Sequence, residues 1–564
     1  KVFTLLGALL GMLLAALDQT VVATAGPAIQ AHLHVEPSLY AWITTAYLVT
    51  STVMVPIYGK LSDLLGRKAI LVAGIIIFLL GSLLCGIAGS ALQLILYRAI
   101  QGMGSAALFT SAFAVVADIF PPAVRGKYQG MFGAVFALSS VVGPLAGGFI
   151  TDRFGWHWVF FINLPVGAIA LAFIFLRMPA LRRRISGSIA ECLDIPGALA
   201  LMLAVVPLLL ALSLGERAAS PGSTGTSWGS WQILSLFAVA TLGVAFFLRA
   251  ERSAKNPILD LRLFRNRTFA VGNLAAFVIG SGFLGSIVFL PLFMVNVVGL
   301  SATSSGLTLT PLTLGLVAGN VVSGQIVARI GKYKALIMTS LVLLVIGYAV
   351  MGFSLSPQSS QAEVTLKMFL VGIGLGPSIP LFTLVVQNAV PVRQVGVATS
   401  SVTFFRQLGS TVGLAILGTI FGASLTGAMR TRMAEATVSA PPEVRAQIGA
   451  IRAPGSAPAR APAEGGEGTW TFRASELKAQ IHARFEARRA QAPGPGDRAQ
   501  LARDEAHALD AVDRVHDAFK WGFTDAVATV YRCAILIAVL ALVIVIFLPE
   551  LPLRRTLGPP PMAE

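Results

Sequence analysis

Charged side chains are scarce in this sequence. Asp, Glu, Lys and Arg make up 12% of the 564 residues, about half the share that is usual in soluble proteins. The first 425 residues also lack polar linkers, and they consist of apolar runs that end in Gly, Pro or a charged residue. Each run has roughly 20 residues, which is enough to span a hydrocarbon core of about 30 Å. These shortages exclude a soluble enzyme, a collagen-like chain and a disordered chain, and they predict an all-α polytopic membrane protein.

Cysteines and catalytic patterns are also sparse. The three cysteines, Cys85, Cys192 and Cys533, lie in or beside apolar runs, so they read as small apolar residues rather than as a disulfide framework. None of the six histidines has metal-ligand spacing with a cysteine or an acid, and no GxxxxGK[ST] phosphate-binding loop is present. The sequence therefore predicts no enzyme, no cofactor and no metal. The missing phosphate-binding loop also argues against ATP as an energy source and leaves an ion gradient in its place.

Fourteen apolar runs are long enough to form membrane helices. We expect them at 2–27, 40–58, 69–89, 92–117, 128–150, 158–177, 193–214, 230–248, 269–296, 306–328, 335–355, 365–388, 402–424 and 523–548. With the N-terminus inside the cell, 22 Lys and Arg residues fall on the cytoplasmic side and 3 in the short loops of the other side, the long insertion at 425–522 being left out of this count. Because an excess of Lys and Arg marks cytoplasmic loops, both termini are predicted to be cytoplasmic. The net charge of +16 then reflects topology and not nucleic-acid binding.

Two loops repeat one pattern and divide the chain. Gly59–Lys68 and Gly324–Lys332 each place a glycine seven residues after another glycine, with basic residues next. Their order predicts two six-helix halves with two inserted helices between them, and a substrate site at the interface of the halves. The expected units are 1–180 (N-terminal half), 181–268 (inserted helices and cytoplasmic linker), 269–424 (first five helices of the C-terminal half), 425–522 (an extracytoplasmic, partly helical insertion) and 523–564 (last helix and cytoplasmic tail).

The insertion at 425–522 departs from the apolar pattern. Ala436–Gly468 is rich in Ala, Pro and Gly and is expected to be disordered. Helical patterns follow near 472–485 and 501–519, and the second runs almost directly into the last span. Two interpretations stay open. The helices pack on each other or on the membrane surface, or residues 470–520 form a docking surface for another protein.

Five short motifs stand in order along the chain. They are Leu17–Val22 with Pro27, Gly59–Lys68, Arg98–Gly104, Gly143–Gly148 and Trp156–Pro165. The first four are similar to the family patterns LDxTxVNVALP, GxLaDrxGrk, RxxQGxG and GPxxGG. This sequence departs from the patterns at four positions. Ala23 and Gly26 replace the usual Asn and Leu, Leu64 replaces the usual Arg, and Ser139 replaces the usual Gly. Together the five resemble the 14-helix drug:proton antiporter branch of the major facilitator superfamily, over nearly the whole chain except 425–522. The resemblance implies the major facilitator fold and transport by alternating access.

Two charged residues inside apolar runs are the predicted proton-coupling residues. Asp18 is the only carboxylate well inside such a run. An acid within the membrane is a functional hypothesis by default, because burial favours its protonation. The alternative is a structural Asp bonded to helix neighbours such as Thr20. The resemblance gives Arg98 a role in proton coupling, and the alternative is a structural Arg bonded to helix carbonyls. The sequence leaves open whether Asp18 and Arg98 touch.

Two further motifs have roles implied by the resemblance. The loop after the second helix would form a cytoplasmic latch that stabilises the outward-facing state; its residues are Gly59, Asp63, Gly66, Arg67 and Lys68. Ordinary anchoring by basic residues is the alternative. The fifth helix carries the antiporter motif Gly143, Pro144, Gly147 and Gly148. Proline bends a helix and glycines permit close helix approach, so packing alone is the alternative here.

These features predict a proton-coupled exporter of lipophilic small molecules, of multidrug type, in the plasma (inner) membrane of a bacterium. The 33 Phe residues and few buried charges favour selection by apolar contact and shape. Asp18 would carry the proton or bind a cationic drug in competition with it. Since one carboxylate balances one positive charge, neutral and monocationic substrates are expected. The alternatives are a dedicated exporter of one metabolite, lipid or antibiotic, and a transporter-like receptor that moves nothing.

Overall fold

The computed structural model describes residues 2–35, 37–178, 194–219, 227–300, 309–391, 394–438, 474–491 and 494–553. These residues form helices joined by short turns and loops. In a bilayer, a helix satisfies every backbone polar group within its own segment, which explains why long apolar runs become helices. The N-terminal bundle comprises α1 (Val2–His32), α2 (Pro37–Leu65), α3 (Arg67–Gly86), α4 (Ala91–Ile119), α5 (Pro122–Phe154), α6 (Trp158–Phe161) and α7 (Asn163–Arg177).

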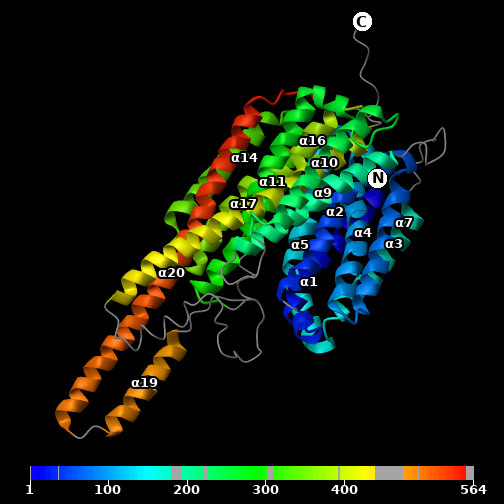
Figure 1. Ribbon diagram of the computed structural model, residues 1–564. Helices are drawn as coiled ribbons and strands as arrows, with labels where there is room; N and C mark the ends of the chain where they lie inside the picture. Colours follow the sequence, from blue (N-terminus) through cyan, green and yellow to red (C-terminus); the bar gives the residue numbers. More distant parts are fainter. Residues whose placement is uncertain are drawn as a thin grey trace.

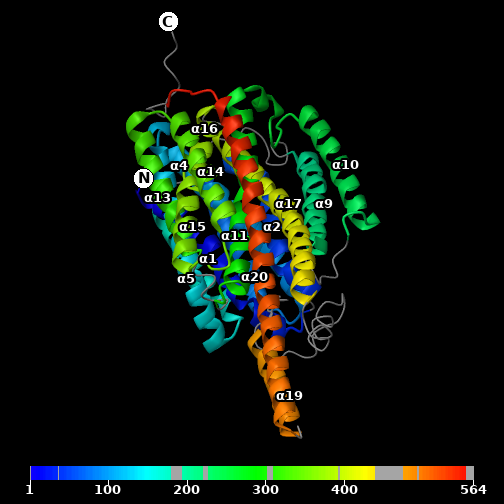
Figure 2. The same cartoon turned by 90° about the vertical axis from the view of Figure 1, so that its left-hand side faces the viewer.

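The second bundle stands beside the first, and an inserted helix pair lies at its flank (Figures 1 and 2). The inserted pair is α9 (Ile195–Ala219) and α10 (Trp231–Ser253), followed by the short 3-10 helix η1 (Leu261–Arg265). The C-terminal bundle comprises α11 (Arg267–Asn296), α13 (Thr310–Ile330), α14 (Lys334–Ser354), α15 (Gln361–Leu375), α16 (Ser378–Asn388), α17 (Val395–Val438) and α20 (Pro495–Ile546). Helix α19 (Ala474–Gln491) packs on the projecting part of α20.

Within the described residues, thirteen segments are long and apolar enough to cross a membrane. Helix α2, of 29 residues, packs among them against α4 and α17. The fourteen expected spans are compatible with this arrangement. Large apolar side chains on the outside of the bundle, such as Leu80, Phe175 and Leu536, are more than half exposed and provide a lipid-facing surface.

Several boundaries differ from the expected ones. The run 365–388 is two helices, because Gly376 and Pro377 separate α15 from α16 and proline has no N–H to donate. The run 158–177 is likewise divided, into α6 and α7. Some expectations lie outside the described residues: Cys192, the start of the span 306–328, and Ala436–Gly468 beyond residue 438.

Each bundle has its own apolar core. Two clusters occupy the N-terminal bundle and include Phe78, Phe113 and Trp156. A larger cluster fills the C-terminal bundle and includes Phe293 and Tyr531. A smaller cluster joins α2 and α4 to α9 and α17. Separate cores are what two bundles need in order to move as rigid bodies against each other.

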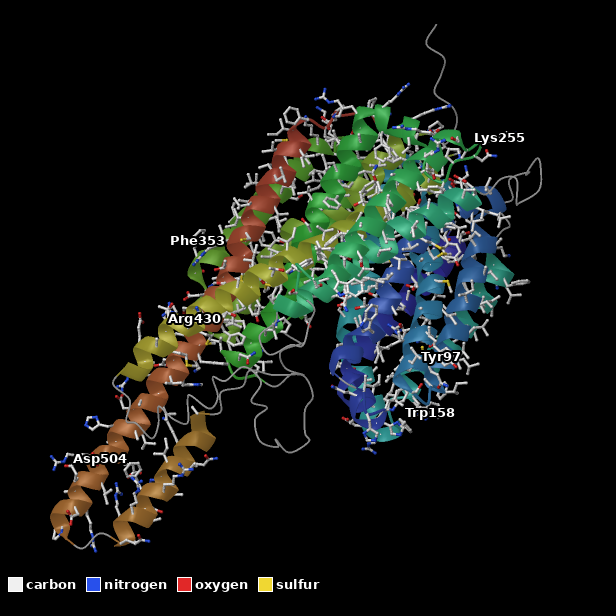
Figure 3. The ribbon with its side chains drawn as sticks, in the orientation of Figure 1. Tyr97, Trp158, Lys255, Phe353, Arg430 and Asp504 are labelled. Carbon is white, nitrogen blue, oxygen red and sulfur yellow. The ribbon has the colours of Figure 1, made fainter. Side chains whose placement is uncertain are left out.

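The two ends of the molecule differ. We call the end that carries Lys60, Arg67, Arg125 and Lys334 the basic end, and the opposite end the far end. Lys255 lies at the basic end and Tyr97 and Trp158 at the far end (Figure 3). The two bundles converge at the basic end, whereas α19 and part of α20 project from the far end as a hairpin (Figure 1).

One of the two helices of the hairpin, α20, continues into the C-terminal bundle. Helix α20 has 52 residues, or about 78 Å at 1.5 Å per residue, so it far exceeds a core of about 30 Å. Ile481 and Phe485 of α19 are buried against Ala508, Val512 and Val515 of α20. The sequence predicted a second pattern that nearly joins the last span, and the structure makes the two one helix. This packing favours the interpretation of a helical pair packed on itself; the docking surface at 470–520 stays a prediction.

Ion pairs reinforce the hairpin. The Nδ1 atom of His482 lies 2.6 Å from Oε1 of Glu505, and Arg489 also binds the Glu505 carboxylate. The hydrogen bond to Glu505, together with the charges of Glu486 and Glu505, raises the pKa of His482 above its ordinary value. Asp504 lies near the hairpin tip (Figure 3). The hairpin is therefore held by charge as well as by apolar contact.

Candidate functional site

A polar cluster centred on Asp18 lies in the N-terminal bundle. Asp18 of α1 has no exposed surface, and 2% of Arg98 of α4 is exposed. Nη1 of Arg98 donates to Oδ2 of Asp18 at 2.7 Å. The other oxygen, Oδ1, accepts from Nε2 of Gln101 at 2.8 Å and from Nδ2 of Asn163 at 2.9 Å. The two predicted proton-coupling residues thus form a direct, buried ion pair across 80 positions of sequence.

Arg98 has additional partners. Its Nη1 also donates to Oε1 of Gln101 at 2.6 Å, and its guanidinium lies over the ring of Tyr47, 4.2 Å from the centroid. Tyr47 in turn donates to Oγ of Ser105 at 2.6 Å. Within the described residues, two buried atoms of the cluster, Nε of Arg98 and Oδ1 of Asn163, have no hydrogen-bond partner. The cluster therefore keeps unused bonding capacity that a rearrangement could satisfy.

Sequence reasoning found part of this cluster. Gln101 belongs to the same motif as Arg98, one helical turn away, so its spacing was a usable signal. Asn163 lies in the Trp156–Pro165 run, to which no role was assigned. Asn163 also donates to Oγ of Ser82 at 3.0 Å, and nothing in the sequence singled out Ser82 or Tyr47.

The predicted latch connects the two bundles at the basic end. Oδ1 and Oδ2 of Asp63, near the end of α2, accept from the backbone N–H groups of Gly396 and Val397 at 3.2 and 3.0 Å. These N–H groups belong to the first turn of α17. The N–H groups of a first turn have no partners within their own helix, and the start of a helix favours a negative charge. Asp63 therefore caps a helix of the opposite bundle. The sequence placed this latch between helix ends but did not identify α17.

Arg67 completes the latch. It is 1% exposed; its Nη2 donates to Asp63 Oδ1 at 2.5 Å and its Nε donates to Asp118 Oδ2 at 2.9 Å. A further hydrogen bond reaches Ser62. Arg67 thus holds Asp63 in place while Asp118 of α4 holds Arg67.

The remaining latch residues have distinct roles. A Cβ atom at Gly59 would lie 2.0 Å from Oγ of Ser400, so glycine is what lets α2 touch α17. Gly66 has φ 91°, a left-handed conformation between α2 and α3 that favours glycine. Lys68 is turned away from the opposite bundle, because its Nζ donates to the carbonyls of Phe175 and Met178 at 2.9 and 2.6 Å.

The motif of α5 packs against α1 close to Asp18. A Cβ at Gly143 would lie 2.0 Å from Oγ1 of Thr20, and one at Gly147 would lie 2.3 Å from Oγ1 of Thr24. Thr20, two residues after Asp18, also donates to the carbonyl of Ser139 at 2.9 Å. Pro144 lies within α5, where it removes one helix hydrogen bond. Gly148 makes no comparable contact, since a Cβ there would meet no atom within 4 Å.

Contacts between α5 and α13 also close the basic end. A Cβ at Gly324 would lie 2.3 Å from the carbonyl oxygen of Gly126, so the two backbones touch there. Gln129 of α5 donates to Oε1 of Gln387 in α16 at 3.2 Å. Together with Asp63 and Gly59, these contacts make the basic end the closed end of this conformation.

Comparisons with known proteins agree with this geometry. The family model described as Major Facilitator Superfamily matches residues 8–414. The multidrug transporter protein MdtP of Bacillus subtilis is 42% identical over 417 residues, 74% of each chain. The tetracenomycin C resistance and export protein of Streptomyces glaucescens is 31% identical over 466 residues, 81% of this chain and 84% of that one.

A solved structure shares the fold. The human organic anion transporter MFSD10 (TETRAN) superposes with a TM-score of 0.53 at 18% identity, covering 74% of this chain and 93% of that chain. At this identity the likeness concerns the fold alone. The matched family model, the similar sequences and the two-bundle arrangement agree, and this chain belongs to the major facilitator superfamily.

Proposed function

We propose that this protein is a proton-coupled exporter of lipophilic small molecules that works by alternating access. The observation that carries the proposal is the buried Asp18–Arg98 pair, in which both carboxylate oxygens of Asp18 accept hydrogen bonds of 2.7–2.9 Å. Relatives named as a multidrug transporter and as a resistance and export protein support an export function. Intact ionisable residues inside the membrane favour transport over the transporter-like receptor.

The pair offers a physical link between a proton and a conformation. A proton on Asp18 removes the negative charge that balances Arg98, and a lone buried guanidinium is costly. Movement of Arg98 toward new hydrogen-bond partners then lowers the free energy, and its unpartnered Nε is one group that such a movement could satisfy. One proton crossing the membrane releases about 2.3 kcal/mol per 100 mV, whereas export against a tenfold gradient costs about 1.4 kcal/mol.

The closed basic end defines the state described here. We assign the basic end to the cytoplasm, because Lys and Arg concentrate in cytoplasmic loops. The conformation is then outward-facing, with the latch formed. Opening would require Asp63 to leave the first turn of α17. The bacterial relatives support a bacterial inner membrane as the location.

The substrate class is proposed at two levels. Neutral and monocationic lipophilic molecules follow from the single acid Asp18; in this conformation both of its oxygens are engaged, so a cation reaches it only after the pair opens. A dedicated exporter of one antibiotic or metabolite is the second candidate, and the tetracenomycin C export protein among the relatives favours it.

Transport in proteoliposomes tests the proposal. Purified protein is reconstituted with an imposed pH gradient and offered a panel of neutral and monocationic fluorescent substrates. Proton-driven movement of several unrelated compounds supports a multidrug exporter, and movement of one compound class supports the dedicated exporter. Absence of movement together with no pH change on substrate addition would contradict both.

The orientation predicts where a protease cuts. The stretch 439–473 joins α17 to α19 and is rich in Ala, Pro and Gly. We expect an external protease to cleave it in intact cells, leaving the membrane helices in place. The measurement is the fragment pattern in intact cells compared with inverted membrane vesicles. Cleavage in inverted vesicles alone would reverse the assigned topology.

A further inference from the structure

The side chain of Arg406, within α17, has no partner in the part of the chain that the structure describes. Arg406 lies 11 positions after Val395, so it is about 16 Å along α17 from the latch, or about half of the hydrocarbon core. Its backbone carbonyl accepts from Ser410, but among the described residues its guanidinium has neither a hydrogen bond nor an ion pair. Ionisable residues at this depth are rare, and by default they indicate a functional site.

Arg406 belongs to the interior and not to the lipid-facing surface. Within α17, no residue from Val395 to Ser410 is exposed, so other helices surround this stretch on every side. The guanidinium lies deep among protein atoms, and yet Arg406 retains intermediate exposure. A side chain that is largely surrounded and still partly accessible can be reached by a small molecule.

The packing of α17 changes at this level. Residues 395–404 are all buried, whereas the four consecutive residues 405–408 are partly accessible. The loosening is partial, because α11 stays in close contact at this level: a Cβ at Gly280 would lie 2.2 Å from the carbonyl oxygen of Arg406. Ser400, which touches Gly59 of the opposite bundle, is about 9 Å closer to the basic end. Arg406 therefore lies just beyond the closure, at the level where residues of α17 become partly accessible.

The helices that pack against α17 supply no acid at this depth among the residues that the structure describes. Helix α17 packs against α2, α4, α9, α11, α16 and α20. Where their side chains are described, the acids lie toward helix ends. Asp63 and Asp118 bind Arg67 at the basic end, and Asp525 binds Arg432 at the far end, 2.6 Å away. Gly280 and Gly409 let the backbones of α11 and α17 touch, which leaves no room for the guanidinium between them.

From these observations we infer that Arg406 is a specificity-determining residue of the transport path, which binds the anionic group of a lipophilic monoanion. Two aromatic residues, Phe404 and Phe405, directly precede it in α17, and their ring centroids lie 5.5 Å apart. A guanidinium suits a carboxylate or a sulfonate, and an aryl group attached to that anion makes it a lipophilic monoanion. The inference rests on the proposed exporter function and extends its substrates beyond neutral and monocationic molecules.

A matched pair of probes tests this inference. Anthracenesulfonate and anthracenesulfonamide share one ring system, and only the sulfonate carries a permanent charge. Export of both is measured in proteoliposomes with wild type, Arg406→Gln, Arg406→Lys and Arg532→Gln. Arg532 is the matched control, because it is an arginine of the same bundle whose Nε donates to the carbonyl of Gly352 at 2.8 Å and whose guanidinium lies over the ring of Phe353.

We expect Arg406→Gln to lower the sulfonate-to-sulfonamide export ratio by about tenfold or more, since a charge-assisted hydrogen bond is lost. Arg406→Lys should keep most of the ratio, and Arg532→Gln should leave it unchanged. An unchanged ratio in Arg406→Gln, or an equal loss of both probes, overturns the inference.

Ligand binding gives a second readout that does not require transport. Sulfonate should raise the Tm of the wild type more than sulfonamide does, because a ligand stabilises the state that binds it. This difference should vanish in Arg406→Gln and persist in Arg406→Lys. If neither probe is exported by the wild type but the Tm difference holds, the exporter proposal fails and the anion site stands. Equal Tm shifts by both probes in the wild type overturn the site.

Discussion

Replacing Asp18 by Asn is expected to abolish proton-driven export while leaving the protein folded. Asn matches the shape of Asp and still accepts a hydrogen bond, but it releases no proton. Because Arg98 loses its counter-charge in a fully buried position, the variant should also lose about 3–5 kcal/mol of stability. Export of a neutral substrate in proteoliposomes and thermal unfolding in detergent are the two measurements.

Two controls separate coupling from folding. The double variant Asp18→Asn with Arg98→Gln removes both charges, so it should recover much of the lost Tm and still export nothing under a pH gradient. Asp525→Asn removes an acid from a half-exposed pair at the far end and should export at a near-wild-type rate. A full export rate in Asp18→Asn would mean that another group carries the proton.

Replacing Asp63 by Asn should open the basic end. The change weakens the two bonds to Gly396 and Val397 and removes the negative charge at the first turn of α17. A hydrogen bond to a charged group is worth about 1.5–3 kcal/mol, so the ratio of closed to open protein should fall by about tenfold to a hundredfold. Arg67 keeps Asp118 as a partner at 2.9 Å, which preserves the N-terminal bundle.

Spin labels across the basic end can measure this shift. Cysteines at positions 127 and 332, in a background without the three native cysteines, place labels on opposite bundles near α5 and α13. In Asp63→Asn the longer-distance population should grow. Lys68→Gln is the matched control, since Lys68 binds carbonyls of its own bundle. An unchanged distance distribution in Asp63→Asn would remove the latch from the mechanism.

The sequence predicted the positions of the spans and the chemistry of two charged residues, because apolar runs and an intramembrane acid are local signals. The contact between Asp18 and Arg98 is not local. It depends on how α1 packs on α4, and no spacing in the sequence encodes that packing. The latch was incomplete for the same reason, since the groups that Asp63 binds lie 333 and 334 positions away.

Two other omissions have different causes. Sorting basic residues by loop left Arg406 out, since it lies inside a predicted span. A buried cation needs a partner as much as a buried acid does. The extension of α17 beyond residue 424 was missed because hydropathy falls there while helix formers such as Ala, Glu and Arg continue. The helix predicted near 501–519 and the last span were expected as neighbours, and they are one helix, α20.

Because α20 is one continuous helix, it connects the projecting hairpin rigidly to the C-terminal bundle. No proline interrupts the helix between its N-terminal Pro495 and Ile546, and the part before the predicted span, 495–522, is about 42 Å long. Helix α20 is anchored in the C-terminal bundle, so any tilt of that bundle swings the hairpin tip through a proportionally larger arc. A fluorophore at Asp504 would then report each change in the tilt of that bundle.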